Sequence, residues 1–197
     1  MNYLAHAYLS FGNKEILAGN MISDFVKGKK KFDYPPGIQK GIYLHRMIDV
    51  FTDAHAATKE ARLILKPSVG LYAGAFVDVI YDHFLATDKK EFAADALKNF
   101  AHLTYKTLHE YIHLLPEKFS QMLPYMSSQN WLYNYSTLWG TEKSFGGVSR
   151  RALYLKGDHE AFKTFEQHYY LFQQCYDFFF PDVKQYAFTQ FKELENN

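Results

Sequence analysis

The sequence predicts an all-α protein that folds as a single-domain helical bundle. Long segments carry apolar residues three and four positions apart, as at Leu44, Ile48 and Phe51, and this spacing is typical of helices. No hairpin dipeptide separates two alternating segments, so strands are not expected. Of the 197 residues, 48% are hydrophobic and 18% are aromatic, which is enough to bury one large core. We therefore expect one domain over residues 1–197.

Few turn signals interrupt the chain, and they set the order of the expected helices. The breaks fall at "FGNKE" (11–15), "KGKKKFDYPPG" (27–37), "KPSVG" (66–70), "LPEK" (115–118), "GTEKSFGG" (140–147) and "KGDHE" (156–160). Asp88 and Asp158 are placed to cap the helices that follow them. His55 is placed to end a helix, and "GTEKSFGGVSRR" is expected to be a loop that leads into one.

Composition excludes several classes of function. The net charge of +1 gives no overall field toward nucleic acid or membrane, and the aromatic-rich C-terminal half lacks a basic groove for bases. The single cysteine, Cys175, excludes an internal disulfide and thiolate-rich metal sites. No run of about 18 apolar residues predicts a membrane span, and "MNYLAHAYLSF" has no basic region typical of a signal peptide. We expect a cytoplasmic protein.

Ionisable residues gather in two apolar segments at helical spacing. In "GIYLHRMIDVFTDAH", His45, Asp49 and Asp53 are four positions apart and share one helix face. In "FVDVIYDHFLA", Asp78 and Asp82 do the same, and His83 can reach their space from the side. Carboxylates and imidazoles on two facing helices are suitable ligands for Mn, Mg, Fe or Zn ions.

A buried ion-pair network is the alternative to a metal site, and the residues leave both open. Asp49 can pair with Arg46, three residues before it, and His6 can be a hydrogen-bonded core histidine. However, no lysine or arginine lies between Pro67 and Lys89 to compensate the acids of "FVDVIYDHFLA". Buried acids without a cation repel one another, which favours a bound metal ion.

Four motifs, in order from Met1 to Ala86, resemble the acyl carrier protein phosphodiesterase family: "MNYLAHAYLSF", "GNMISDFVKG", "GIYLHRMIDVFTDAH" and "FVDVIYDHFLA". The later "SFGGVSRRA" also fits the pattern of that family. The resemblance implies a helical enzyme distantly similar to HD-type metal phosphohydrolases. It would release 4′-phosphopantetheine from holo-acyl carrier protein, a reaction linked to fatty acid biosynthesis and lipid metabolism. The family depends on a divalent cation, with Mn²⁺ favoured and Mg²⁺, Fe²⁺ or Zn²⁺ possible.

The resemblance also implies roles for individual residues. The implied metal ligands are Asp24, His45, Asp49, Asp78, Asp82 and His83. The expected catalytic residues are Asp78, Asp82 and His83, together with Arg46, which is a candidate to neutralise phosphoryl charge. His6 and Asn20 match family positions and are expected to support the ligands. One departure from HD enzymes is plain: this chain has "DH" at 82–83 rather than the histidine–aspartate order.

Basic residues are expected to contact the phosphate or an acidic carrier protein. They are Lys27, Lys29, Lys30, Lys31, Arg150 and Arg151. The four lysines are equally explained as a solvated loop. Two other functions stay open, namely an HD-like phosphohydrolase that acts on a nucleotide or another small phosphodiester, and a non-catalytic module that binds carrier protein. The sequence does not determine the oligomeric state.

Overall fold

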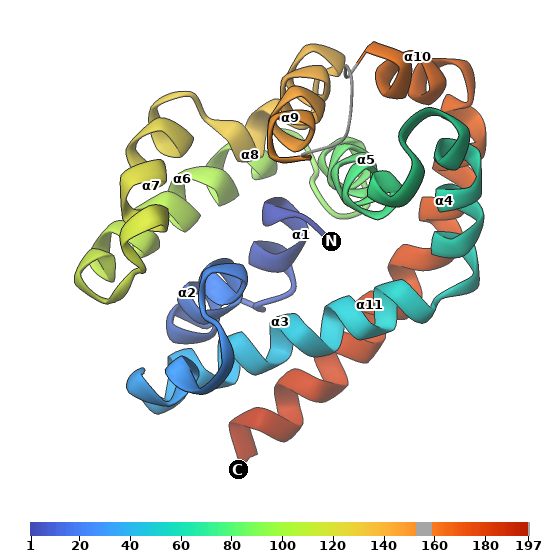
Figure 1. Cartoon of the computed structure of the whole chain (residues 1–197). Helices are drawn as coiled ribbons and strands as arrows, with labels where there is room; N and C mark the ends of the chain where they lie inside the picture. Colours follow the sequence, from blue (N-terminus) through green and yellow to red (C-terminus); the bar gives the residue numbers. More distant parts are fainter. Residues whose placement is uncertain (153–158, 197) are drawn as a thin grey trace.

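The structure is a computed structural model that describes residues 1–152 and 159–196, and its regular elements over these ranges are all helical (Figure 1). This confirms the expected all-α fold. The first half contains α1 (Tyr3–Tyr8), α2 (Lys14–Ile22), α3 (Pro36–Ala54), α4 (Ala56–Val69) and α5 (Ala73–Thr87), with short 3₁₀ turns at Ser23–Phe25, Gly28–Asp33 and Gly70–Tyr72. The second half contains α6 (Ala96–Glu110), the 3₁₀ turn Ile112–Leu114, α7 (Glu117–Ser128), α8 (Trp131–Asn134), α9 (Leu138–Arg151), α10 (His159–Gln167) and α11 (Tyr169–Asn196).

Two glycines let α2 and α3 pack with their backbones almost in contact. A Cβ atom on Gly19 would lie 2.1 Å from the carbonyl oxygen of Ile38, and one on Gly41 would lie 2.2 Å from that of Ile16. Only glycine fits at such a separation. The close approach places Asn20, which follows Gly19, against the middle of α3, where His45 begins the row of ionisable residues on that helix.

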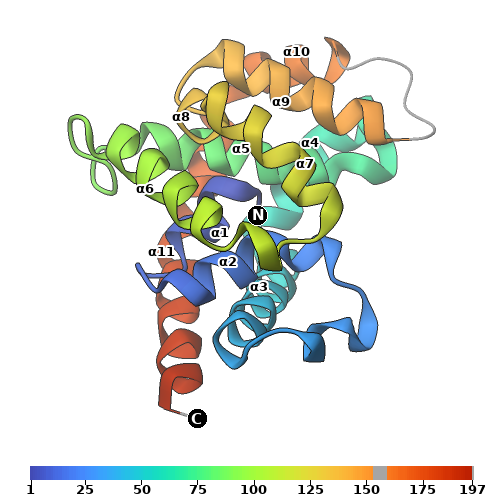
Figure 2. The same ribbon diagram turned by 90° about the vertical axis from the view of Figure 1, so that its left-hand side faces the viewer.

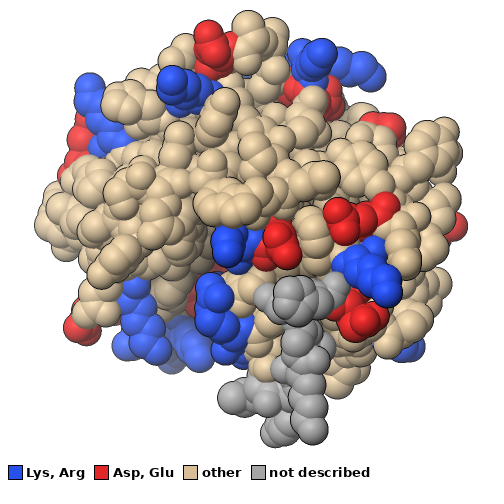
Figure 3. Space-filling view, turned by 90° about the horizontal axis from the view of Figure 1, so that it is seen from above, with Lys and Arg blue, Asp and Glu red and all other residues tan. Residues whose placement is uncertain are grey.

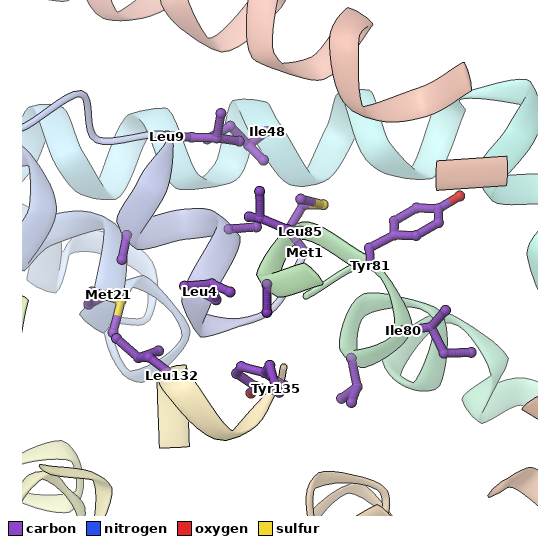
Figure 4. Close-up of a cluster of buried hydrophobic side chains, with 14 of the residues drawn as sticks. Met1, Leu4, Leu9, Met21, Ile48, Ile80, Tyr81, Leu85, Leu132 and Tyr135 are labelled. Atoms are coloured by element: carbon purple, nitrogen blue, oxygen red, sulfur yellow. The ribbon is translucent and has the colours of Figure 1, made fainter. Parts of the chain in front are cut away.

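The helix α5 lies in the core, with α1 and α2 on one side of it and the long helix α11 on another (Figures 1 and 2). Apolar side chains from the N-terminal segment, including Met1 and Leu4, pack between α3 and α5 (Figure 4). Leu85 of α5 and Tyr135, just after α8, line the same cluster. Since this packing buries α1 along most of its length, the side chains of α1 are held in fixed positions.

Several predicted boundaries are wrong. "GTEKSFGGVSRR" is not a loop, because it lies within the helix α9, whose N-terminus is capped by the Thr137 hydroxyl accepting from the N–H of Gly140. Asp88 ends α5 rather than starting the next helix, which begins at Ala96. The predicted end of a helix at His55 is confirmed, while the predicted cap at Asp158 lies outside the described residues.

The helical run Ala56–Thr87 is long and apolar enough for a membrane span by length and composition alone. Helices in protein cores meet the same test. Here the apolar side chains Phe76, Ile80 and Phe84 are buried in the protein's own core, and Asp78 and Asp82 interrupt the apolar run. The run is therefore explained as core, and the expected absence of a membrane span stays a prediction.

Candidate metal centre beside the first helix

Three side chains from two helices meet at one point and can hold a metal ion. They are His6 of α1 and His45 and Asp49 of α3, and one potential ligand atom from each lies within 4.8 Å of the others. The Nε2 atom of His6 lies 3.2 Å from Asp49 Oδ1, and the Nε2 atom of His45 lies 3.0 Å from Asp49 Oδ2. We call this the His6–His45–Asp49 group.

The orientation of the His45 ring is set by its other nitrogen. Nδ1 lies 2.7 Å from the backbone carbonyl oxygen of Asn20, to which it donates. Nε2 therefore faces Asp49 and also Asp24, whose Oδ1 is 3.2 Å away. A histidine that donates one N–H to a carbonyl and aims the other nitrogen at carboxylates has the arrangement that metal-ligating histidines use.

The two histidines have opposite protonation preferences. Burial and, to a smaller extent, the neighbouring charge of His45 together lower the pKa of His6 to about 4. Burial also disfavours a charged His45, but hydrogen bonds and charges from Asp24 and Asp49 outweigh it and raise the His45 pKa to about 9. Burial opposes the charge of Asp49 as well, yet its close contacts with the two histidines hold its pKa far below the usual range.

Buried polar atoms without partners fit a cation in this group. Neither ring nitrogen of His6 has an aligned hydrogen bond among the described residues, although both are buried. The Oδ1 atom of Asn20 is also buried without a partner, while its Nδ2 donates to the carbonyl oxygen of His6 at 2.9 Å. The side chains of Asp49 and Asp24 are 39% and 75% exposed, so an ion can enter from the solvent side. Two imidazoles with carboxylates suit a divalent transition metal.

Asp78 and Asp82 hold the N-terminal segment of the chain. Asp78 Oδ1 lies 3.0 Å from the α-amino group of Met1, which is also 3.6 Å from Asp49 Oδ1. Burial works against the charge on this amine, but Asp78 and Asp49 raise its pKa to about 10. The α-amino group of Met1 is thus a cation beside Asp78 of α5. The sequence search missed it because only lysine and arginine were considered as cations.

The carboxylate of Asp82 caps the first turn of α1 from a different helix. Its Oδ2 accepts the N–H of Leu4 at 2.8 Å, and its Oδ1 accepts the N–H of Ala5 at 3.1 Å. Complete burial raises the pKa of Asp82 to about 7, although both backbone donors favour the charged form. Because both oxygens are engaged with backbone, we do not place Asp82 in the metal group.

His83 lies on another face of α5 and joins three later segments. One ring nitrogen, Nδ1, lies 2.7 Å from the carbonyl oxygen of Tyr135, and the other, Nε2, lies 2.8 Å from the hydroxyl of Tyr169. The Thr141 hydroxyl is 3.1 Å from Nδ1. Since both nitrogens have partners, the contacts give His83 a structural role, and its predicted role as a metal ligand receives no support from them.

The predicted basic contacts fall into two places. Lys27, Lys29 and Lys30 are exposed on the segment between α2 and α3, and Lys31 packs over the ring of Phe32. Arg46 donates from Nη2 to the carbonyl oxygen of Val26 at 2.8 Å, so it anchors the start of that segment. Arg150 and Arg151 lie at the end of α9, where they line a pocket that also includes Tyr3.

Of the predicted site residues, the structure brings together Asp24, His45 and Asp49, with Asn20 supporting His45. It also places His6, which was expected only to support the ligands, within the metal group. The sequence carried a signal for this change, since "NYLAHAYLS" places a histidine in an apolar segment, but only the contact between α1 and α3 reveals its partner. The assignment of individual ligands stays a prediction.

The chain matches known proteins over almost all of its length. The model of the acyl carrier protein phosphodiesterase family matches residues 1–183. The acyl carrier protein phosphodiesterase of Photorhabdus laumondii is 32% identical over 188 residues, which cover 95% of each chain. Those of Klebsiella pneumoniae and Yersinia pestis are 31% and 30% identical over 95% of this chain and 97% of theirs.

No solved structure matches significantly, so the expected similarity to HD-type phosphohydrolases stays a prediction. The family itself rests on the match over residues 1–183 and on relatives that align almost from end to end. The sequence motifs that suggested it lie around the metal group and along α5 and α9. The chain belongs to the acyl carrier protein phosphodiesterase family.

Proposed function

We propose that the chain hydrolyses the phosphodiester that joins 4′-phosphopantetheine to a serine of holo-acyl carrier protein. Water adds to phosphorus, the bond from phosphorus to the serine oxygen breaks, and the serine takes up a proton. The products are apo-acyl carrier protein and 4′-phosphopantetheine. The observation that carries the proposal is the His6–His45–Asp49 group, in a chain whose relatives are named for this activity.

A divalent cation fits the proposed centre, with Mn²⁺ favoured and Mg²⁺, Fe²⁺ or Zn²⁺ as alternatives. His6, His45 and Asp49 would hold it, and Asp24 lies beside His45 at the edge of the group. When bound, such an ion polarises a phosphoryl oxygen and lowers the pKa of a water molecule. Asn20 fixes the His45 ring through its carbonyl oxygen, so one nitrogen of that ring stays directed at the site.

The chain itself supplies groups for charge and proton transfer. Asp24 is largely exposed at the mouth of the group, and its carboxylate is suited to accept a proton from water. The hydroxyl of Tyr3 keeps its proton at neutral pH, since an ordinary tyrosine loses it only near pH 10 and burial raises the Tyr3 pKa further. Arg151 is suited to neutralise phosphoryl charge, as guanidinium groups pair well with phosphate oxygens.

An acidic carrier protein needs a basic contact surface, and the exposed lysines 27, 29 and 30 supply one. They follow Asp24 directly in the chain, so a protein bound over them lies next to the metal group. Opposite charges on the two partners speed association and set its orientation more than they raise affinity. This role for the lysines is part of the proposal.

The decisive experiment is mass spectrometry of holo-acyl carrier protein incubated with the protein and Mn²⁺. Loss of the arm from the carrier protein and appearance of free 4′-phosphopantetheine are expected. Turnover of a nucleotide or small-phosphodiester panel without release of the arm would favour an HD-like phosphohydrolase with another substrate. Binding of carrier protein at one-to-one stoichiometry, with no release at saturating metal, would instead indicate a non-catalytic module.

A further inference from the structure

A pocket of about 680 Å³ opens near the start of α1. Its walls are the start of α1, the helices α7 and α8, and one face of α9. In Figures 1 and 2 the helices α7, α8 and α9 lie together on one side of α1. The volume lies within the range of about 300–1,000 Å³ that is typical of pockets for small molecules.

We propose that this pocket binds the pantetheine arm of the carrier protein, with the phosphate end at Tyr3 and Arg151 and the thiol end against Trp131 and Trp139. This inference rests on the proposed function and deepens it, since it gives the arm a binding place. Four observations support it, namely the position of the pocket, the chemistry of its walls, one glycine and the exposed surface around it.

Tyr3 joins the pocket to the metal group. Its ring lines the pocket, and it lies three residues before His6 on the same face of α1. Both Arg151 and Asp24 also act on the pKa of its hydroxyl. Asp24 in turn lies 3.2 Å from His45 Nε2. A phosphate at the metal group therefore has the pocket directly beside it, with an arginine at the junction.

The walls combine apolar and amide groups, and so does the arm. Trp131, Trp139 and Met122 give apolar contacts. Three amide side chains add polar contacts, and one end of each amide makes a hydrogen bond within the protein. Asn2 Nδ2 donates to the Tyr135 hydroxyl, and Gln129 Oε1 accepts from the Trp131 indole. Asn134 Nδ2 donates to the backbone carbonyl oxygen of Gln129.

The opposite ends of these amides have no hydrogen bond within the described residues. The two asparagines offer a carbonyl oxygen each, and Gln129 offers an amide N–H₂. A pantetheine arm carries two amides, each with one donor and one acceptor, so acceptors and a donor in the wall match its needs. A plain hydrocarbon chain would leave these groups unpaired at a cost.

Gly147 keeps the pocket open. It lies inside α9, where glycine destabilises a helix by about 0.5–1 kcal/mol relative to alanine. Close packing does not explain it, because among the described residues a Cβ atom there would meet only Arg150 Nη2, at 3.9 Å. Gly140, seven residues earlier on the same face, is different, since its Cβ would lie 2.0 Å from the Asn134 carbonyl oxygen. A larger residue at 147 would fit the fold and occupy the pocket.

The surface around the pocket is suited to a protein-bound ligand. In Figure 3, which looks down on the molecule from above, a broad uncharged surface is bordered by both basic and acidic side chains. Tyr125 and Trp139 are 62% and 60% exposed on α7 and α9. An arm that enters from a docked carrier protein needs such an open approach, whereas a free metabolite is usually enclosed.

Tryptophan fluorescence tests the proposal directly, because both tryptophans of the chain line the pocket. Free pantetheine and free 4′-phosphopantetheine are titrated into the protein in separate experiments. Each is expected to give a saturable change in fluorescence, and 4′-phosphopantetheine is expected to bind more tightly because of Arg151. No change with either compound would overturn the proposal, as would a response to octanoate alone.

Gly147→Leu fills the pocket, and Gly147→Ala is its matched control with the same gain in helix propensity. Gly147→Leu is expected to weaken 4′-phosphopantetheine binding about tenfold or more and to raise KM for holo-carrier protein by a similar factor. Gly147→Ala, which adds a single methyl group, is expected to have a smaller effect than Gly147→Leu in both measurements. Equal thermal unfolding midpoints for the two variants exclude misfolding as the cause.

The outcomes separate this inference from the proposed function. If the parent protein releases the arm while Gly147→Leu keeps the parental KM, the pocket proposal is overturned and the proposed function stands. If 4′-phosphopantetheine binds with the expected fluorescence change but no carrier protein is hydrolysed, the pocket is supported and the proposed function fails.

Discussion

The imidazole rings of His6 and His45 stack with their centroids 3.8 Å apart and their planes 15° from parallel. One ring comes from α1 and the other from α3, and Asp49 contacts both. Two imidazolium ions at this distance would repel each other, so only one ring carries the second proton and the positive charge. The carboxylates of Asp24 and Asp49 stabilise the charge on His45, so His6 stays neutral with one unprotonated ring nitrogen. His6 can therefore bind a metal ion directly, whereas on His45 a metal ion would replace a proton.

The contribution of His6 and His45 to the free energy of unfolding of the metal-free protein is expected to be largest near pH 6.5. The pKa of His6 falls from 6.5 to about 4 on folding, so the unfolded chain binds more protons between these values and lower pH destabilises the fold. The pKa of His45 rises from 6.5 to about 9, so the folded chain binds more protons there and higher pH destabilises it. Each slope approaches about 1.4 kcal/mol per pH unit.

Urea unfolding in the presence of a chelator, from pH 5 to 9, measures these slopes. His45→Gln should reduce the decline above pH 6.5, leaving the part above about pH 8 that comes from the Met1 amine, whose pKa is raised to about 10 on folding. His6→Gln should reduce the decline below pH 6.5. An unchanged alkaline slope in His45→Gln would show that another group titrates there.

Asp49→Asn is expected to abolish binding of Mn²⁺ and hydrolysis of holo-carrier protein. Asp49 is the carboxylate that contacts both histidines, and an amide is a far weaker metal ligand. Asp53→Asn is the matched control, since Asp53 lies four residues later on α3 but pairs with Arg62 on the surface. Metal content of the purified variants and calorimetric titration with Mn²⁺ make the comparison. Equal metal affinity in the two variants would remove Asp49 from the site.

The helical fold was predictable because it follows from local spacing, whereas boundaries that depend on tertiary packing were not. "GTEKSFGGVSRR" contains three glycines and reads as a loop, yet it is helical because Gly140 packs against the backbone of Asn134 and Thr137 caps the first turn. Asp88 has the chemistry of an N-cap, but the helix that it follows continues to Thr87.

The candidate site was predictable in part, for a similar reason. His45 and Asp49 share one face of one helix, so their spacing reveals them. Asp78 and Asp82 share a face as well, but their partners are an α-amino group and two backbone N–H groups, which no residue pattern can indicate. His83 looks the same in sequence as a ligand, and only its contacts with Tyr135 and Tyr169 show that it joins helices.

Asp82→Ala is expected to destabilise the protein by about 2–4 kcal/mol, because two buried backbone N–H groups lose their acceptor. Asp82→Asn keeps one acceptor oxygen and should cost less. Asp95→Ala is the control, since Asp95 is exposed at the start of α6 and its side chain makes no capping bond. Urea unfolding gives the free energies. If Asp82→Asn were fully stable but lost Mn²⁺, Asp82 would be a metal ligand instead.

The double variant Lys29→Glu/Lys30→Glu is expected to weaken binding of an acidic carrier protein about tenfold at low salt, since it reverses two exposed charges beside the metal group. The loss should shrink as salt is added, because exposed charges are screened over about 10 Å at 0.1 M ionic strength. Lys31 is left in place because it packs over Phe32. Lys89→Glu/Lys90→Glu makes the same change in the segment between α5 and α6, which lies on the opposite side of the molecule in Figure 2. Equal affinities for the two double variants, measured by surface plasmon resonance at low and high salt, would show that the carrier protein docks elsewhere.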